Sequence, residues 1–291
     1  MIKATIIADS IYQGKRITTF ELEYPRFIHS EFMTHRVFSR NAASSRAIPV
    51  LKMLEQVRNA PATPIHWGVN KPGMQADEEL TGEALTDAKT IWKDTAKVVS
   101  GCVEALVSIG LHKQVANRPL EVFQLMKTIL TATEWDNWYE LRNHKDADPN
   151  IHLLAQRMLE AHTASIPNEL KVGEWHLPYI HCERLEGKMT YSTLDTLLTL
   201  DEARMVSASC CAQVSYRKND DSLDKAIAIF DKLINSKPQH ASPIEHQATP
   251  LEFVLDPRWG GSWPVGVTHQ DRDGKYWSGN FQGWLQFRQL I

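Results

Sequence analysis

The chain has 291 residues, of which 43% are hydrophobic and 23% charged, and its formal net charge is −3. This is the composition of an ordinary globular protein with one or two domains and a sizeable core. The slight acidic excess argues against a nucleic-acid partner, because proteins that follow phosphate backbones usually carry a basic excess.

The first predicted elements are two strands and a helix. Residues 3–10 and 16–24 show β-like runs on either side of a turn signal at Gly14, which predicts a hairpin. A proline then opens a helical run over 25–38, at the first helical position, where its missing N–H does no harm. Residues 55–75 are rich in Pro and Gly and predict a surface excursion.

Helices are predicted to dominate the middle of the chain. The period over 77–109 is helical, with an apolar stripe made of Ile91, Val98, Val99, Val103, Leu106 and Val107. Residues 111–144 predict one or two more helices, with a start or a kink at Pro119. Residues 150–162 predict a short amphipathic helix.

The last third is predicted to alternate loops and helices. A loop rich in aromatic and polar residues covers 173–192, and two helices follow over 200–216 and 221–236. A tail rich in Gly and Trp covers 256–280, and residues 280–290 close the chain as a helix. The predicted fold class is therefore α+β, a mainly helical domain with a small mixed or antiparallel sheet.

The cysteines and the apolar runs indicate a compartment. Cys102, Cys182, Cys210 and Cys211 form no CxxC pair, and a disulfide framework is unexpected in a chain of this length. No apolar run reaches the ~18 residues that a membrane helix needs, and the start of the chain does not read as a signal peptide. We expect a cytoplasmic protein with no membrane partner.

The segment THRVFSRNAASSR, residues 34–46, is strongly polar although it follows an apolar run. Arg36, Arg40 and Arg46 are cationic at any working pH. The segment is either a solvated loop with surface arginines or an anion site. As an anion site it would turn out of a helix, and the small residues 42–44 would let backbone N–H groups approach a phosphate. Arg46 would add a forked contact.

Four separated segments together resemble the flavin-dependent thymidylate synthase family. The polar segment resembles the family signature RHRxxSxNExSxR, which it matches at His35, Arg36, Ser39, Asn41, Ser44 and Arg46. Residues 133–151 resemble the family's NxxxLRxxxxAQxEI, with matches at Asn137, Leu141, Arg142, Ala147 and Ile151. CAQVSY, which contains Ser215, resembles ARVSY, and HASPIEH, residues 240–246, resembles HxTPFEH.

The order of these boxes differs from the family order, in which ARVSY and the TPFEH-like box precede the signature. Here both follow it, so the chain resembles a circularly permuted relative whose start is cut just after the TPFEH-like box. The signature would lie in a half over 1–165, and the other two boxes in a half over 190–291, of a single catalytic domain over 1–291. Such a cut can preserve a fold when the original termini lie close together.

The chain also departs from the family pattern. Thr34 stands at the first arginine of the signature, Ala42 stands at its glutamate, and Glu31 stands at a glutamine upstream. The arginine that the family places after a KEVA segment falls on Asn117, with Arg118 one position on.

The resemblance implies a reaction and its cofactors. Family members methylate C5 of dUMP to give dTMP, with a methylene group from methylenetetrahydrofolate and a hydride from flavin reduced by NADPH. The cofactor would be FAD, and the partner a deoxypyrimidine monophosphate, in active sites shared between the subunits of a homotetramer. No cysteine nucleophile is needed, because the cofactor performs the hard chemistry.

The resemblance also assigns roles to residues. Arg142 and Ser44 would act in catalysis, with Arg142 holding the negative charge that develops on a pyrimidine oxygen. Substrate contacts would come from Arg46, Ser44, Arg118, Glu31 and Arg142. Flavin contacts would come from His35, Arg36, Asn137, Ser215, Ser242 and Glu245.

Each assignment has a structural alternative when the residues are taken alone. Arg142 is then better explained as a cation at a helix C-terminus, which the helix dipole favours. Arg118 is then a surface arginine, and His35 with Arg36 a structural pair at a helix end. The spacing of His144, His152, His181 and Cys182 supports no metal site.

Three functions stay open. The first is C5 methylation of dUMP. The second is hydroxymethylation of dUMP or dCMP, motivated by the departures at Glu31, Thr34 and Ala42. The third is a flavin- or nucleotide-binding homologue that has lost catalysis, which the missing signature arginine favours, whereas the retained Ser44, Arg46 and Arg142 favour an enzyme.

Overall fold

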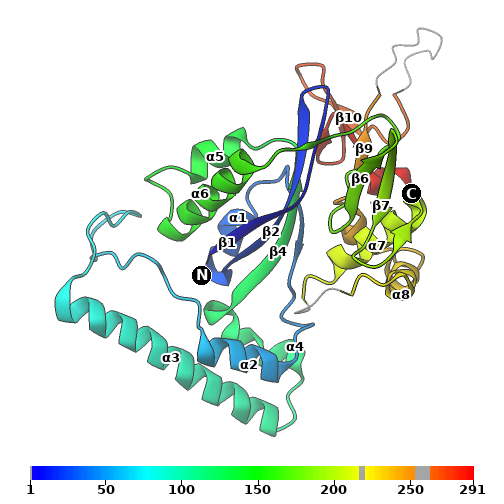
Figure 1. Ribbon diagram of the computed structural model, residues 1–291. Coiled ribbons are helices and arrows are strands. Elements are labelled where there is room, and N and C mark those ends of the chain that lie inside the picture. Colours follow the sequence, from blue (N-terminus) through cyan, green and yellow to red (C-terminus); the bar gives the residue numbers. More distant parts are fainter. Residues whose placement is uncertain (1, 216–219, 253–262) are drawn as a thin grey trace.

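The computed structural model describes residues 2–215, 220–252 and 263–291, and a five-stranded sheet lies at its centre (Figure 1). The strand order is β3-β4-β2-β1-β5, and every neighbouring pair is antiparallel except β1 and β5. The strands are β1 (Lys3–Tyr12), β2 (Lys15–Pro25), β3 (Ser39–Ala42), β4 (Leu125–Ala132) and β5 (Asn168–Glu169). With its helices and small sheets, the fold is α+β, as predicted.

The predicted N-terminal hairpin is confirmed as β1 and β2. Its two-residue turn has positive φ angles at Gln13 (46°) and Gly14 (78°), the pattern of the turn whose twist matches two antiparallel strands. Tyr12 and Lys15 are therefore direct partners. A bulge between Ile6 and Ala8 interrupts the regular pairing of β1 with β2.

Helices cover one face of the sheet. Phe20, Leu22 and Leu130 pack there against α1 (His29–Phe32), α5 (Asp136–Arg142) and α6 (Pro149–Ala164) in one buried cluster. The predicted helix over 150–162 is thus confirmed as α6. Its start is fixed by Asp148, whose side chain accepts hydrogen bonds from the backbone N–H groups of residues 150 and 151.

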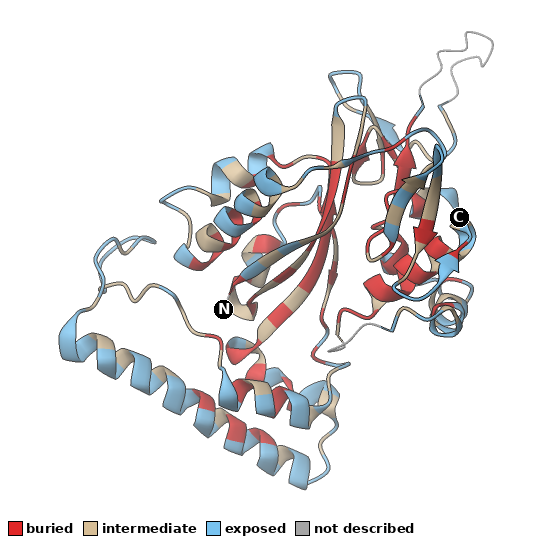
Figure 2. Ribbon diagram, viewed as in Figure 1, coloured by how far each residue is buried: buried red, intermediate tan, exposed pale blue. Residues whose placement is uncertain are grey.

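The C-terminal part, residues 170–291, covers the other face. Ile17 packs on Phe281 and Trp284, and Ile129 packs on Cys211. Successive residues of a strand point to opposite faces, so β2 and β4 bury both of theirs, as Figure 2 shows for the red strands at the centre.

The C-terminal part is made of short elements. Its helices are α7 (Leu200–Ala212) and α8 (Leu223–Leu233), with 3-10 turns η3 (Ser242–Ile244) and η5 (Phe287–Leu290). Its strands are β6 (His181–Leu185), β7 (Lys188–Ser192), β8 (Leu197–Leu198), β9 (Ala248–Pro250), β10 (His269–Gln270), β11 (Tyr276–Ser278), β12 (Phe281–Gln282) and β13 (Trp284–Gln286). They form three small sheets, β6-β7-β8, β13-β9 and β10-β11-β12.

An arm of helices extends from the end of the sheet (Figure 1). It contains α2 (Val50–Asn59), α3 (Gly82–Ser108) and α4 (Lys113–Ala116), and a cluster of its own around Met53, Val103 and Phe123. The helix predicted over 77–109 is confirmed as α3, but its buried stripe is different. Ile91 and Val98 are 65% and 66% exposed, and the buried line runs through Ala96, Ser100 and Val103.

The prediction of helix throughout residues 111–144 was wrong at its centre. A 3-10 turn, η2 (Arg118–Phe123), begins at the predicted break around Pro119, but residues 125–132 form strand β4. β4 lies between β2 and β3, and its β-branched Thr128, Ile129 and Thr131 suit a strand buried on both faces.

Other boundaries also differ from the predictions. The helix expected over 25–38 is only η1 (Arg26–Ile28) and α1, and residues 39–42 leave it as strand β3. Residues 55–59 belong to α2, residues 173–192 contain the β6–β7 hairpin, and the helix from residue 200 ends at Ala212. The closing helix over 280–290 is instead β12, β13 and η5. Residues 253–262, which include the start of the Gly- and Trp-rich tail, lie outside the described residues, as does Tyr216.

None of the helices among the described residues combines the length and the apolar character that crossing a membrane requires.

Candidate active site

The signature segment lies on β3, an edge strand beside β4. Ser39 and Asn41 are both buried, and each holds the C-terminal part against the sheet. The Ser39 hydroxyl accepts hydrogen bonds from the side-chain amides of Gln286 (3.0 Å) and Asn280 (3.3 Å). The Asn41 side chain donates to the carbonyl of Cys211 (3.2 Å) at the end of α7. These two signature residues therefore join the two parts of the chain.

Arg142 stands at the C-terminal end of α5 and is held by three residues of the segment before β3. Its Nη1 lies 3.1 Å from the Glu31 carboxylate, its Nε donates to His35 Nε2 (3.1 Å), and its Nη2 donates to the Thr34 hydroxyl (3.2 Å). A guanidinium has five N–H donors, so two remain for a ligand. The side chain is 20% exposed, which leaves it accessible.

The two departures from the family pattern at Glu31 and Thr34 thus meet at a single residue. Glu31 supplies the counter-charge of Arg142. Thr34, which stands where the family signature has an arginine, offers a hydroxyl that accepts a hydrogen bond from Arg142. The Thr34 hydroxyl donates in turn to the Glu31 carbonyl (2.7 Å). The two departures therefore reduce the positive charge around Arg142 and fix the direction of its guanidinium.

His35 is a neutral, buried support for Arg142. Burial lowers its pKa to about 4, and the positive charges of Arg142 and Arg40 act in the same direction. Its ring lies edge-on to Trp138 at 4.8 Å and parallel to Phe38 at 5.7 Å. Because Nε2 accepts from Arg142, the ring proton is on Nδ1.

Ser44 and Ser215 bring the signature and the VSY box together. The backbone N–H of Ser44 donates to the Ser215 hydroxyl (3.0 Å), and the N–H of Ala43 donates to the Lys127 carbonyl (2.8 Å). The expectation that these N–H groups cradle a phosphate was therefore wrong, because both have partners within the chain. The exposed Ser44 hydroxyl stays available.

Arg36 and Arg46 flank β3 and differ from the other arginines nearby. Both are exposed, and neither has an ion-pair or hydrogen-bond partner among the described residues. Arg118 instead donates to Glu121 (3.0 Å), a carboxylate that also accepts from the Ser45 hydroxyl (2.5 Å). The two unpaired cations are therefore better placed than Arg118 to bind an anion.

Asn117 has a structural role at the position of a family arginine. It is fully buried, and its side-chain amide donates to the carbonyls of Ser45 (2.7 Å) and Ile48 (2.9 Å). It therefore fixes the turn that carries Arg46, where an arginine would have supplied a charge.

Glu245 and Ser242, from the SPIEH box, lie near the other end of β3. Gln286 donates to the Glu245 carbonyl (2.9 Å) as well as to Ser39, which joins the box to the signature. The Glu245 carboxylate accepts from Arg288, yet burial keeps its pKa above the ordinary value. Ser242 is exposed on η3.

Arg40 is a residue of this region that the sequence did not single out as a site. It is half-buried and donates to the carbonyls of Phe32 (3.2 Å) and His35 (3.0 Å). Burial lowers its pKa, while Tyr24 and Glu245 act to raise it. It stands between Ser39 and Asn41, at a position that the signature leaves open, so the only sequence signal for it was its charge within the polar segment.

The structure thus brings most of the predicted residues to β3 and its surroundings. Asn137 lies exposed on α5 with no hydrogen-bond partner among the described residues. Within the described ranges there is no group of three or more side chains that could hold a metal ion.

A family model described as "Thymidylate synthase complementing protein" matches residues 16–168, which is more than half of the chain. The match covers the signature and α5, and it excludes the VSY and SPIEH boxes. The circular permutation therefore stays a prediction. The chain has no match among curated protein sequences.

Solved structures give weaker likenesses. A UMP/dUMP methylase PolB from Streptomyces cacaoi bound with 5-Br dUMP is 18% identical, with a TM-score of 0.42 over 51% of this chain and 67% of that chain. The same enzyme bound with 5-Br UMP is 16% identical, with a TM-score of 0.46 over 56% of this chain and 89% of that chain. Thymidylate Synthase X from Helicobacter pylori with FAD and dUMP is 15% identical, with a TM-score of 0.36 over 50% of this chain and 67% of that chain.

Proposed function

Because the chain belongs to the family of thymidylate synthase complementing proteins, we propose that it is a flavin-dependent enzyme that methylates C5 of a deoxypyrimidine monophosphate, converting dUMP into dTMP. Its cofactor is FAD, and its co-substrates are methylenetetrahydrofolate and NADPH. The observation that carries the proposal is the convergence on β3, where Ser215 bonds Ser44 at one end and Gln286 joins Ser39 to Glu245 at the other.

The substrate phosphate is assigned to Arg46 and Ser44. The exposed, unpaired guanidinium of Arg46 can make a forked, charge-assisted contact, and the Ser44 hydroxyl can add a donor. Asn117 supports this position because it holds the turn between residues 45 and 48. Arg118 contributes less, because Glu121 already neutralises it.

The pyrimidine is assigned to Arg142. Its two remaining N–H donors can stabilise negative charge on a ring oxygen, and its direction is fixed by Glu31, Thr34 and His35 before any ligand binds. Such preorganised donors stabilise a transition state without reorganising during the reaction. His35 is then a positioning residue, because its accepting nitrogen is occupied by Arg142.

Flavin contacts are assigned to residues with free polar atoms around β3. Arg36, Asn137 and Ser242 are exposed, and the Ser215 hydroxyl accepts from Ser44 but keeps its own proton to donate. His35 and Glu245 fit less directly, since each is engaged with an arginine. Bound flavin would supply the hydride, and these residues would orient it.

We propose that the protein is a homo-oligomer, a tetramer. The exposed apolar face of α3 supports this assembly. Ile91 and Val98 are seven residues apart, so they lie on the same side of the helix, and both are about two-thirds exposed. A second copy of the chain would remove this face from water.

The proposal is tested with three arginine variants. Arg142→Ala should lower turnover by about 10²–10³-fold, because it removes a contact that strengthens in the transition state. Arg46→Ala should mainly weaken dUMP binding, because a phosphate contact is equally strong before and during the reaction. Arg118→Ala, an exposed arginine in an ion pair, is the matched control and should change little.

The measurements are flavin absorbance of the purified protein, nucleotide titration, and product mass with dUMP, methylenetetrahydrofolate and NADPH. A colourless protein that gains no flavin on titration contradicts the proposal. A product heavier by a hydroxymethyl group, or a product from dCMP only, would instead indicate hydroxymethylation of dUMP or dCMP. Normal turnover of Arg142→Ala shows that Arg142 only ends its helix.

A further inference from the structure

Five buried polar side chains form a continuous hydrogen-bonded chain beneath the sheet. Ser10 Oγ lies 2.9 Å from His176 Nδ1, and His176 Nε2 lies 2.8 Å from Thr19 Oγ1. Thr19 Oγ1 lies 2.7 Å from Thr131 Oγ1, which lies 2.9 Å from His246 Nδ1. Each of the five is at most 5% exposed. These four hydrogen bonds are therefore shielded from bulk water.

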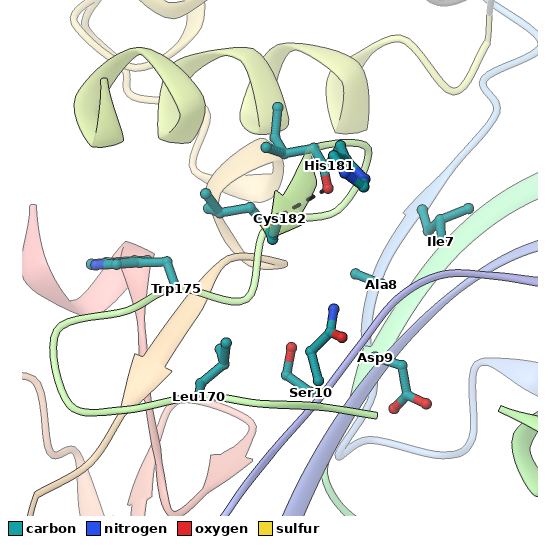
Figure 3. Close-up of a pocket in the computed structure, with 11 residues that line it drawn as sticks. Ile7, Ala8, Asp9, Ser10, Leu170, Trp175, His181 and Cys182 are labelled. Carbon is teal, nitrogen blue, oxygen red and sulfur yellow. Dashed lines mark hydrogen bonds between the residues drawn. The ribbon is translucent and has the colours of Figure 1, made fainter. Parts of the chain in front are cut away.

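The hydrogen-bonded chain runs from Ser10 on β1 to His246 beside β3, because Thr131, which contacts His246, is the direct strand partner of Ser39. Thr19 and Thr131 are directly opposite on β2 and β4, on the face that the C-terminal part covers. At one end Ser10 borders a cavity of about 250 Å³ between β1 and residues 168–182, lined also by Asn168, Trp175 and His181 (Figure 3). At the other end His246 follows Glu245, and its Nε2 is buried with no partner among the described residues.

The protonation states allow the chain to run in two directions. Burial lowers the pKa of His176 to about 4 and that of His246 to about 3, with His176 adding to the effect on His246. Both rings are therefore neutral near pH 7, with one N–H each. A neutral imidazole and a hydroxyl can each donate one hydrogen bond and accept another.

The number of protons then couples the two histidines. Two hydroxyl protons must serve the three hydrogen bonds between His176 and His246. If His176 donates from Nε2 to Thr19, then Thr19 donates to Thr131 and Thr131 donates to His246 Nδ1. The single proton of His246 is then on Nε2. If His176 accepts at Nε2, then His246 donates from Nδ1. The two rings must therefore have the same tautomer.

We propose that Ser10, His176, Thr19, Thr131 and His246 form a proton relay between the cavity and the active site. When a basic atom of a ligand bound in the active site takes the proton of His246 Nε2, each group passes one proton along, and Ser10 takes one from water in the cavity. The relay is then set to work in the opposite direction, so that His246 Nε2 takes a proton and Ser10 releases one. Its service to catalysis rests on the proposed function, but the relay itself does not.

The test is ¹⁵N NMR of the protein labelled at histidine, without substrate or flavin turnover. His176 and His246 should show the same tautomer. Thr131→Val, which removes the hydroxyl but keeps the shape, should uncouple them, and Thr131→Ser should not. Thr19→Val and Thr19→Ser give a second matched pair, and thermal melting identifies any variant that fails to fold.

Proton exchange tests the cavity end. Ser10→Ala should slow the exchange of the His246 imidazole proton with water by about tenfold, the factor that the net contribution of one hydrogen bond supplies. Ser10→Thr, which keeps the hydroxyl, should exchange as the parent does. Opposite tautomers in the parent, coupling that survives Thr131→Val and Thr19→Val, or unchanged exchange in Ser10→Ala would each overturn the relay. None of these outcomes depends on whether the protein methylates dUMP.

Discussion

Replacing Asp9 by asparagine is expected to destabilise the protein by about 3 kcal/mol. The Asp9 side chain is 5% exposed, and Arg16 binds it through two atoms, Nε at 2.9 Å and Nη2 at 2.5 Å. The hydroxyls of Thr18 (2.9 Å) and Ser165 (2.6 Å) donate to it as well. Arg16 also donates to the carbonyls of His162 and Ser165, so this pair fixes the end of α6 to the hairpin.

The magnitude follows from what asparagine leaves behind. It keeps the shape of the side chain but places an NH₂ group against a donor and leaves Arg16 without a counter-charge. Breaking a buried pair by removing one partner costs about 3–5 kcal/mol. The Arg16 side chain is 26% exposed, so water can partly solvate its charge once the carboxylate is gone. We therefore expect the lower end of this range of destabilisation. At about 2–4 °C per kcal/mol, the melting temperature should fall by about 6–12 °C.

The effect should depend on pH in a definite direction. Burial acts to raise the pKa of Asp9, but the contacts with Arg16, Ser165 and Thr18 outweigh it and leave the pKa below the ordinary value. The unfolded chain therefore binds this proton more tightly, and the contribution is complete above pH ~4 and lost as the pH falls through the folded pKa. The difference between the parent and Asp9→Asn should shrink below pH ~4.

Calorimetry of the parent, Asp9→Asn and Asp94→Asn tests this. Asp94 pairs with Lys97 on the exposed side of α3, with 57% of its side chain exposed, and its replacement should change stability by less than about 0.5 kcal/mol. Equal melting temperatures for the parent and Asp9→Asn would refute the reasoning, and so would an equal loss in both variants.

Two further predictions concern assembly and histidines. Light scattering should give a mass well above the 33.1 kDa of one chain, and Val98→Lys should lower it by charging the exposed face of α3; a monomeric mass with full activity contradicts this. Burial, as the largest cause, lowers the pKa of His29, His35, His162 and His176 to about 4 and that of His246 to about 3. Because these folded values lie below the unfolded ~6.5, stability should fall between pH ~6.5 and ~4, by about 1.4 kcal/mol per pH unit for each histidine. A melting temperature that is equal at pH 7 and pH 5 would contradict it.

Local signals in the sequence were enough where a short segment determines its own geometry. Gly14 marked the hairpin turn, where its φ is 78°, and the helical period marked α3 and α6. The signature residues also pointed to the family that the comparison supports. Each of these features depends on residues within a few positions of one another, so no distant partner was needed to recognise it.

Only the tertiary structure decided the rest, because the deciding partners are far apart in the sequence. The run LMKTILTA at 125–132 fits a helix or a strand by its pattern, and its position between β2 and β3 makes it a strand. The role of Glu31 is set by Arg142, 111 positions away, and the Ser44 amide that was expected to face a phosphate is taken by Ser215. The buried chain from Ser10 to His246 joins residues of β1, β2 and β4 to two histidines of the C-terminal part. Neutral hydrogen-bonding groups leave no spacing pattern in a sequence, and only the packing of two layers brings them within reach.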